Sequence, residues 1–220
     1  LLNPKFTEDA YEMNKKRAIE SIKNAMNRAN YVASTVYPKV LYGADNVLGW
    51  SANGTEKTIN NITLQDVQDY YNKYISRKDA QLIIVGDVKK EDILPKLAFL
   101  NKLPSKDVKL PELKPAPQIA KTKVYFVDVP NAAQTEFRVG YVTDMKYDAL
   151  GDYYKSGVMN FPLGGAFNSR LNIDLREEKG WTYGARGFFD ADKYTGPYNF
   201  SAGIRADATD SALIDIVQIM

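Results

Sequence analysis

The chain has 220 residues, of which 45% are hydrophobic and 25% are charged, so it is long enough to bury a core and too apolar to be disordered. Its 29 Lys and Arg residues nearly balance 27 Asp and Glu residues, and the net charge of +2 gives no electrostatic basis for binding nucleic acid or an anionic membrane. The absence of Cys and His excludes disulfides, a thiolate nucleophile, a Ser-His relay and imidazole metal ligands within these residues.

Periodicity predicts three helices and one short strand in the first hundred residues. The helices show apolar residues at three-to-four spacing, and the strand is a nearly continuous apolar run followed by Gly86-Asp87. Thr63 and Asp66 form a capping-box pattern at the start of the second helix, and Pro95 predicts a break in the third. The helices are expected at 8–36, 64–75 and 90–100, the strand at 80–85, and a glycine-bearing loop at 41–61.

Beyond a proline-rich stretch the pattern changes to strands in pairs. Residues 104–121 hold four prolines, and such a segment neither continues a helix nor donates to a strand ladder, so we expect a linker there. The residues that follow alternate as strands do, with helices between the two pairs. The strands are expected at 124–129, 135–143, 183–190 and 198–204, and the helices at 148–160, 167–178 and from about 209 onward.

The order of these elements indicates the fold class. Strands in adjacent pairs favour antiparallel sheets with helices on one face over a strict alternation of strand and helix. We therefore expect an α/β chain of the α+β type, made of two units that each hold a mainly antiparallel sheet. The units are expected at residues 1–103 and 122–220, joined by the linker at 104–121. Because the chain begins without Met and ends in an apolar run, we expect it to be a section of a longer protein.

The most informative motif lies at residues 164–184. It reads Gly-Gly-Ala-Phe-Asn-Ser-Arg-Leu and then Leu-Arg-Glu-Glu-Lys-Gly-Trp-Thr-Tyr, which predicts an amphipathic helix that Gly180 ends. Arg176 and Tyr183 lie seven residues apart in this motif. Taken singly, each has a plain structural explanation, the first as a solvated helix residue and the second as a half-buried strand residue.

As a whole, the motif resembles the pitrilysin/insulinase family of zinc metallopeptidases, which includes the mitochondrial processing peptidases and their core-protein relatives. Weaker agreements run along the whole chain, among them Ile84-Val85-Gly86-Asp87-Val88. The resemblance implies that residues 1 to about 112 are similar to the latter half of one repeat and those from about 122 onward to the first part of the next. It also implies that Arg176 and Tyr183 hold the substrate backbone and the tetrahedral intermediate opposite a zinc ion.

The same resemblance implies that the zinc itself lies elsewhere. The family's inverted His-x-x-Glu-His motif would precede Leu1, and its further Glu ligand belongs on the first predicted helix. Aligning the family's Glu-Glu-Ile step with residues 19–22 puts Ser21 at the ligand position, whereas a slip of one residue would make Glu20 the ligand. We therefore expect a repeat that lacks catalytic zinc, and a zinc-bearing domain or subunit of the same family as its partner.

Two functions stay open. The resemblance implies a non-catalytic section of a zinc metallopeptidase, inactive by itself, which binds and orients a peptide as an added strand for a zinc site on another domain or subunit. The alternative is a structural or protein-binding module that keeps the peptidase fold and has no role in proteolysis. A stand-alone hydrolase built on carboxylates has no paired-carboxylate motif to support it. Finding His-x-x-Glu-His elsewhere in the parent protein or in a partner would separate the first two.

Overall fold

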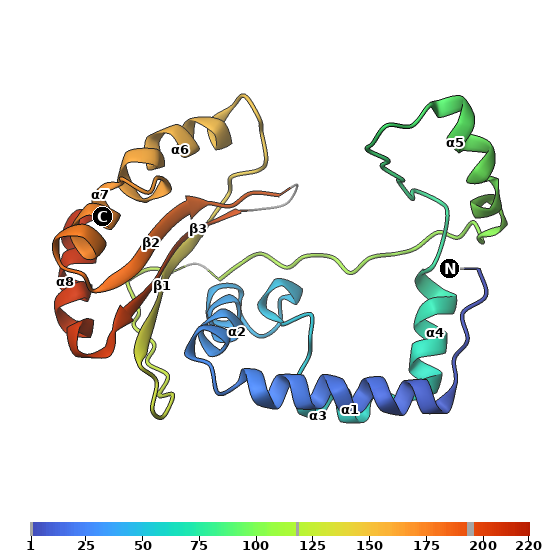
Figure 1. Cartoon of the computed structure of the whole chain (residues 1–220), viewed down its shortest axis with the longest axis horizontal. Helices are drawn as coiled ribbons and strands as arrows, with labels where there is room; N and C mark the ends of the chain where they lie inside the picture. The colour runs from blue at the N-terminus through green and yellow to red at the C-terminus, as the bar shows by residue number, and fades with distance from the viewer. Residues whose placement is uncertain (1, 118, 193–195) are drawn as a thin grey trace. The chain divides into compact units, whose positions relative to one another are not determined.

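The computed structural model describes residues 2–117, 119–192 and 196–220 (Figure 1). By their contacts, the residues of the chain form two compact units. The first unit comprises Leu1–Ile22 and Asn53–Glu112, and the second comprises Lys23–Ala52 and Leu113–Met220. One division thus falls within the proline-rich stretch, while residues 23–52 belong with the second half of the chain. Which repeats of a longer protein these units represent stays a prediction.

The first unit contains helices and, among its described residues, no strand. The Tyr11 hydroxyl and the Lys15 ammonium both donate to the carbonyl of Ile62, at 2.5 and 2.9 Å, so the first helix is joined to the turn between two later ones. The predicted capping box of Thr63 and Asp66 is present, and the predicted break after Pro95 is followed by a 3₁₀ turn. The elements are most of α1 (Glu8–Ala25), which extends past the end of this unit at Ile22, and α3 (Glu56–Asn61), α4 (Leu64–Tyr74), α5 (Lys90–Lys96) and η2 (Ala98–Lys102).

The single long helix predicted at 8–36 is wrong, because two helices occupy this stretch. The first, α1, ends at Ala25, and α2 (Ala29–Tyr42) begins after Arg28, whose extended backbone interrupts the helical hydrogen bonds. The loop predicted at 41–61 is also partly helical, since it contains α3 and the 3₁₀ turn η1 (Val47–Gly49). Side-chain caps that periodicity does not detect start both of these short elements.

Two predicted strands, 80–85 and 124–129, are not strands in the structure. Their apolar side chains are largely exposed, as at Val85 and Val124. Residues of this kind prefer a pleated backbone, but a strand forms only where a neighbour supplies partners for its N–H and C=O groups. The sheet predicted for the first half of the chain is therefore missing from the part that the structure describes.

A three-stranded antiparallel sheet forms the centre of the second unit. Its strands are β1 (Gln134–Thr143), β2 (Thr182–Phe189) and β3 (Gly196–Arg205), in the order β1–β3–β2. Alternation along β3 buries every second side chain, from Tyr198 through Phe200 to Ile204. The three strands agree with the predicted ones, and the α+β fold class is confirmed.

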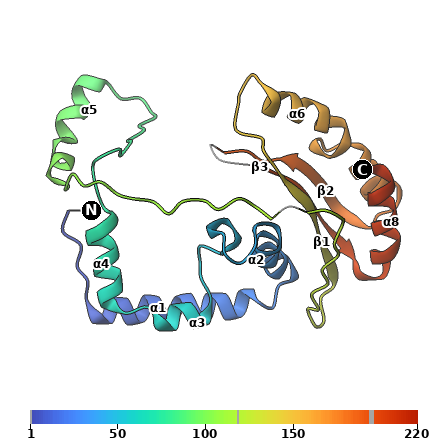
Figure 2. The same cartoon turned by 180° about the vertical axis from the view of Figure 1, so that it is seen from behind.

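Helices cover the buried face of this sheet. Leu171, Leu175 and Ile216 pack against Phe200 and Ile204 and form the core of the unit. Figures 1 and 2 show these helices along one face of the sheet, with α2 on the other face beside β1. None of the helices in the described ranges has the length and apolar character that a membrane crossing needs. The covering elements are α6 (Asp152–Asn160), η3 (Phe161–Gly165), α7 (Arg170–Asn172), η4 (Ile173–Glu178) and α8 (Thr209–Ile219).

Candidate substrate-binding site

The second unit contains a cavity of about 420 Å³. All three strands, the start of α2 and the segment between η3 and α7 contribute to its wall. Small residues make up much of this wall, so backbone groups of the protein lie within reach of a bound molecule. These residues are Gly164, Gly165, Ala166, Gly184, Ala185, Ala202 and Gly203.

Strand β2 is bulged where it borders the cavity. Thr182 pairs with Ile204 and Ala185 with Ala202, so two residues of β2 face Gly203 alone. The Thr182 hydroxyl holds this bulge, because it donates to the Gly203 carbonyl at 2.8 Å and accepts from the Gly184 N–H at 3.1 Å. Tyr183 lies within the bulge.

The structure places the two predicted substrate residues differently with respect to the cavity. Tyr183 borders it directly, and its side chain is 92% exposed. Arg176 does not line it; its side chain is 29% exposed and forms an ion pair with Glu177. The Arg176 guanidinium lies 4.1 Å from the ring centroid of Phe167, however, and Phe167 is part of the cavity wall. The two residues are thus connected through one aromatic ring.

Two asparagines close the outer edge of β2, which sequence reasoning did not foresee. The Asn172 amide donates to the Ala185 carbonyl at 2.7 Å and accepts from the Ala185 N–H at 2.8 Å. The Asn160 amide donates to the Gly187 carbonyl at 2.6 Å. Side chains protect an exposed strand edge in this way from pairing with another strand. A peptide therefore finds these positions of β2 already occupied, and nothing in the sequence pattern of the two asparagines indicated it.

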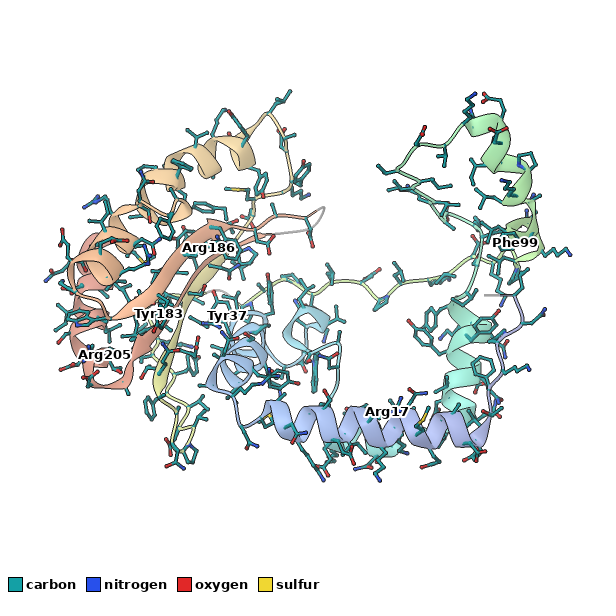
Figure 3. The ribbon with its side chains drawn as sticks, in the orientation of Figure 1. Arg17, Tyr37, Phe99, Tyr183, Arg186 and Arg205 are labelled. Atoms are coloured by element: carbon teal, nitrogen blue, oxygen red, sulfur yellow. The ribbon has the colours of Figure 1, made fainter. Side chains whose placement is uncertain are left out.

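Two arginines and a serine form a row across the face of the sheet that borders the cavity. Arg138 of β1 and Arg186 of β2 both pair in register with Ser201 of β3, so the three side chains share one face. All three line the cavity. Figure 3 shows Arg186 and Tyr183 extending from the same strand. Sequence reasoning missed both arginines, because only the strand register brings them together.

Tyr37 of α2 lies against the same face of the sheet (Figure 3). Its hydroxyl donates to the Tyr198 carbonyl at 3.5 Å. A Cβ at Gly140 would collide with both of these oxygens, which explains why β1 has no side chain there. Burial raises the pKa of the Tyr37 phenol to about 12, Tyr42 adds to the increase, and the positive charge of Arg138 opposes it. At neutral pH the Tyr37 hydroxyl is therefore a neutral donor.

The residues considered for a metal site lie on α1. Ser21 and Glu20 are both exposed, and Glu20 pairs with Lys16 at 4.0 Å. Within the described ranges, no three His, Cys, Asp or Glu side chains lie close enough together to hold a metal ion. A zinc ion at this helix would therefore need ligands that these residues do not supply, whichever of the two occupies the ligand position.

Comparison with known proteins gives three kinds of match. The family model described as "Peptidase M16 inactive domain" matches residues 61–220. Over 185 residues the chain is 29% identical to a Helicobacter pylori protein named "Non-peptidase homolog YmxG". The aligned residues make up 83% of this chain and 41% of that protein. A crystal structure of a peptidase M16 inactive domain from Pseudomonas fluorescens superposes with a TM-score of 0.81 at 23% identity, over 99% of this chain and 52% of that one.

Pitrilysin shares the fold as well. Its crystal structure superposes with a TM-score of 0.62 at 15% identity, over 99% of this chain and 24% of that one. The chain thus spans between two fifths and about half of the length of the more similar relatives, and about a quarter of pitrilysin.

Proposed function

Because the chain belongs to the peptidase M16 family, as a member of its inactive-domain group, we propose that it binds and orients peptide substrate for a zinc site on another domain or subunit. In this proposal Arg176 and Tyr183 are the residues that touch the substrate. The observation that supports it best is the position of Tyr183, which stands almost fully exposed at the rim of the cavity on a bulge held by Thr182.

The chemistry of the two side chains fits this role. A phenol O–H and a guanidinium N–H both donate to a peptide carbonyl oxygen, which becomes negative in the tetrahedral intermediate of hydrolysis. The ion pair of Arg176 with Glu177 joins adjacent, partly exposed residues, and such pairs contribute well under about 1 kcal/mol. A substrate oxygen can therefore replace the Glu177 carboxylate, while the Phe167 ring keeps the guanidinium at the cavity wall.

The zinc ion belongs, in this proposal, to a catalytic domain or subunit of the same family. Zinc bound there would polarise the scissile carbonyl and activate the attacking water. The residues of this chain would position the peptide and stabilise the oxyanion, and would bind no metal themselves.

A second candidate function is a structural or protein-binding module without any role in proteolysis. The name of the Helicobacter pylori relative, a non-peptidase homolog, favours it. Under this alternative Arg176 and Tyr183 are ordinary surface residues, and replacing them affects neither assembly nor any catalytic rate.

The test is reconstitution with a catalytic partner. An M16 protein that carries His-x-x-Glu-His and is encoded in the same genome would be purified alone and together with this chain, and zinc-dependent cleavage of a quenched peptide would be measured. We expect turnover to rise when the chain is added and to be lost with a chelator. Equal turnover with and without the chain, in a complex shown to form by gel filtration, would contradict the proposal and favour the structural alternative.

A further inference from the structure

The cavity wall is positively charged along the row of Arg138, Ser201 and Arg186. The proposed function assigns no role to this charge. Adjacent strands of a sheet lie about 4.8 Å apart, so the two arginines flank the serine hydroxyl from the two neighbouring strands. All three line the cavity. Within this row the Arg138 guanidinium already donates to protein acceptors, namely the Glu136 carboxylate at 3.1 Å, the Phe137 carbonyl at 2.8 Å and the Ser34 hydroxyl at 3.4 Å.

The two arginines differ in how their charge is balanced. Arg138 forms an ion pair with Glu136 at 3.1 Å, and the two side chains are only 16% and 12% exposed. Asn30 further holds the Glu136 carboxylate, at 3.4 Å. Arg186 is exposed, and in the part of the chain that the structure describes no carboxylate or carbonyl pairs with its guanidinium. The charged residues of the cavity wall therefore sum to one uncompensated positive charge, on Arg186.

We propose that this cavity is a subsite for a carboxylate of the bound peptide, with Arg186 as the residue that binds it and the Ser201 hydroxyl as a second donor. The inference rests on the proposed function, since it takes the ligand to be a peptide. A guanidinium presents parallel N–H groups that match the two oxygens of a carboxylate.

The balance of charge favours a carboxylate over a phosphate group. One uncompensated cation neutralises a single negative charge, whereas a phosphate carries nearly two at neutral pH. Glu136 lies in the same wall and would repel the second charge. The small residues of the wall also leave room for a peptide backbone: a Cβ at Gly184 would meet only the Asn172 amide oxygen, at 3.8 Å.

The position of the subsite gives it a role in specificity. Tyr183 and Arg186 lie three residues apart on β2 and border the same cavity. A peptide carbonyl held by Tyr183 would therefore place a neighbouring acidic side chain, or the terminal carboxylate, within reach of Arg186. The chain would thus select peptides that carry a negative charge close to the bond that it orients.

The test compares two fluorescent peptides that differ only in one Glu-to-Gln exchange, each made with a free and with an amidated C-terminus. Their affinities would be measured by anisotropy for the unaltered chain, Arg186→Gln and Arg186→Lys. Arg17→Gln is the matched control, because it removes the same charge from α1 in the first unit (labelled in Figure 3), and Arg17 is not one of the residues that line the cavity.

We expect the Glu peptide to bind about tenfold more tightly than the Gln peptide, which corresponds to one charge-assisted hydrogen-bonding group. Arg186→Gln should abolish this preference, Arg186→Lys should retain part of it, and Arg17→Gln should leave it intact. Higher salt should weaken the preference. If amidation of the C-terminus lowers the affinity about tenfold and the Glu-to-Gln exchange does not, the subsite binds the terminal carboxylate.

Equal affinity for the charged and uncharged peptides would overturn the subsite while leaving peptide binding in place. A preference that persists in Arg186→Gln would overturn it too, because another group would then bind the charge. If none of the peptides binds, the proposed function loses support, and the subsite is judged separately with N-acetylglutamate N-methylamide as probe. That compound should shift the Arg186 Nε–H resonance in NMR spectra, its glutamine counterpart should not, and the absence of a shift would overturn the subsite.

Discussion

Asn172 occupies the edge of the sheet next to Ala185 as a residue of a fourth strand would. Its amide oxygen accepts from the Ala185 N–H at 2.8 Å, and its amide nitrogen donates to the Ala185 carbonyl at 2.7 Å. The same nitrogen donates to the Ala166 carbonyl at 3.1 Å. One buried side chain therefore joins the helical segment, the bulged strand and the wall of the cavity.

Replacing Asn172 by Ala should destabilise the chain. The change leaves both backbone groups of Ala185 without a partner in a buried place, and we expect the free energy of unfolding to fall by about 2–4 kcal/mol. Urea denaturation followed by circular dichroism would measure this. Asn168→Ala is the control, because Asn168 is exposed and its loss should change stability by less than about 0.5 kcal/mol. Similar midpoints for the two variants would contradict the role assigned to Asn172.

The raised pKa of Tyr37 predicts a loss of stability at high pH. Burial raises this pKa to about 12 in the folded chain, whereas a tyrosine in the unfolded chain ionises near pH 10. Between these values the unfolded state releases the phenolic proton and the folded state keeps it. The contribution of Tyr37 is therefore fully present below about pH 10 and decreases as the pH rises toward 12.

The size and specificity of this effect can be measured. Because Tyr37 is only partly buried, solvent screening limits its contribution to about 1–2 kcal/mol. Urea midpoints of the unaltered chain and of Tyr37→Phe would be compared at pH 9 and at pH 11.5. From pH 9 to pH 11.5 the urea midpoint of the unaltered chain should fall more than the midpoint of Tyr37→Phe does. A difference that is independent of pH would show that Tyr37 titrates as an exposed phenol does.

In a reconstituted enzyme, Tyr183→Phe should lower turnover more than it weakens substrate binding. A donor directed at a developing oxyanion acts mainly in the transition state, and losing one typically reduces the rate by about 10²–10³. We expect kcat to fall with little change in KM, and Arg176→Ala to behave in the same way. Steady-state kinetics with a quenched peptide would measure both. A lower unfolding midpoint with unchanged turnover per folded molecule would instead identify a structural residue.

The exposed segment at 124–127 predicts poor solubility that one substitution can improve. Phe126 is 84% exposed in it and buries little surface. Phe126→Ala should therefore change stability by less than about 0.5 kcal/mol while reducing self-association in light scattering. The matched control is Phe200→Ala, which removes a fully buried ring and should cost about 3–5 kcal/mol. A comparable loss of stability in both variants would show that Phe126 is packed in solution.

Features that depend on neighbours in the sequence could be predicted. The capping box of Thr63 and Asp66 spans three residues, and it is present in the structure as its pattern predicted. The same holds for the bounds of β1, which were predicted at 135–143 and are Gln134–Thr143, and two of its alternating apolar residues, Phe137 and Val139, pack against the core. The motif at 164–184 is long and contiguous, so it identified the family although the zinc-binding motif is absent from these residues.

Features that depend on distant partners could not be predicted in this way. Residues 80–85 have the composition of a strand, but pairing needs another strand whose position the pattern does not contain. The candidate site shows the same limit, since sequence reasoning named Tyr183 and Arg176 and missed Arg138 and Arg186. Those two arginines are 48 positions apart in the numbering and become neighbours of Ser201 only through the register of β1 and β2 with β3.

The amino-acid sequence by itself determined the family, through the resemblance of one contiguous motif, and the α+β class with the three strands of the sheet, through residue types at short, regular spacing. Only the tertiary structure decided that Tyr183 is exposed, that Phe167 connects Arg176 to the cavity, and that, among the described residues of the cavity wall, Arg186 is the one whose charge no carboxylate balances. These properties arise from a bulge, a ring contact and an ion pair between side chains on different elements. Their energies depend on distance in space, which the order of residues along the chain does not specify.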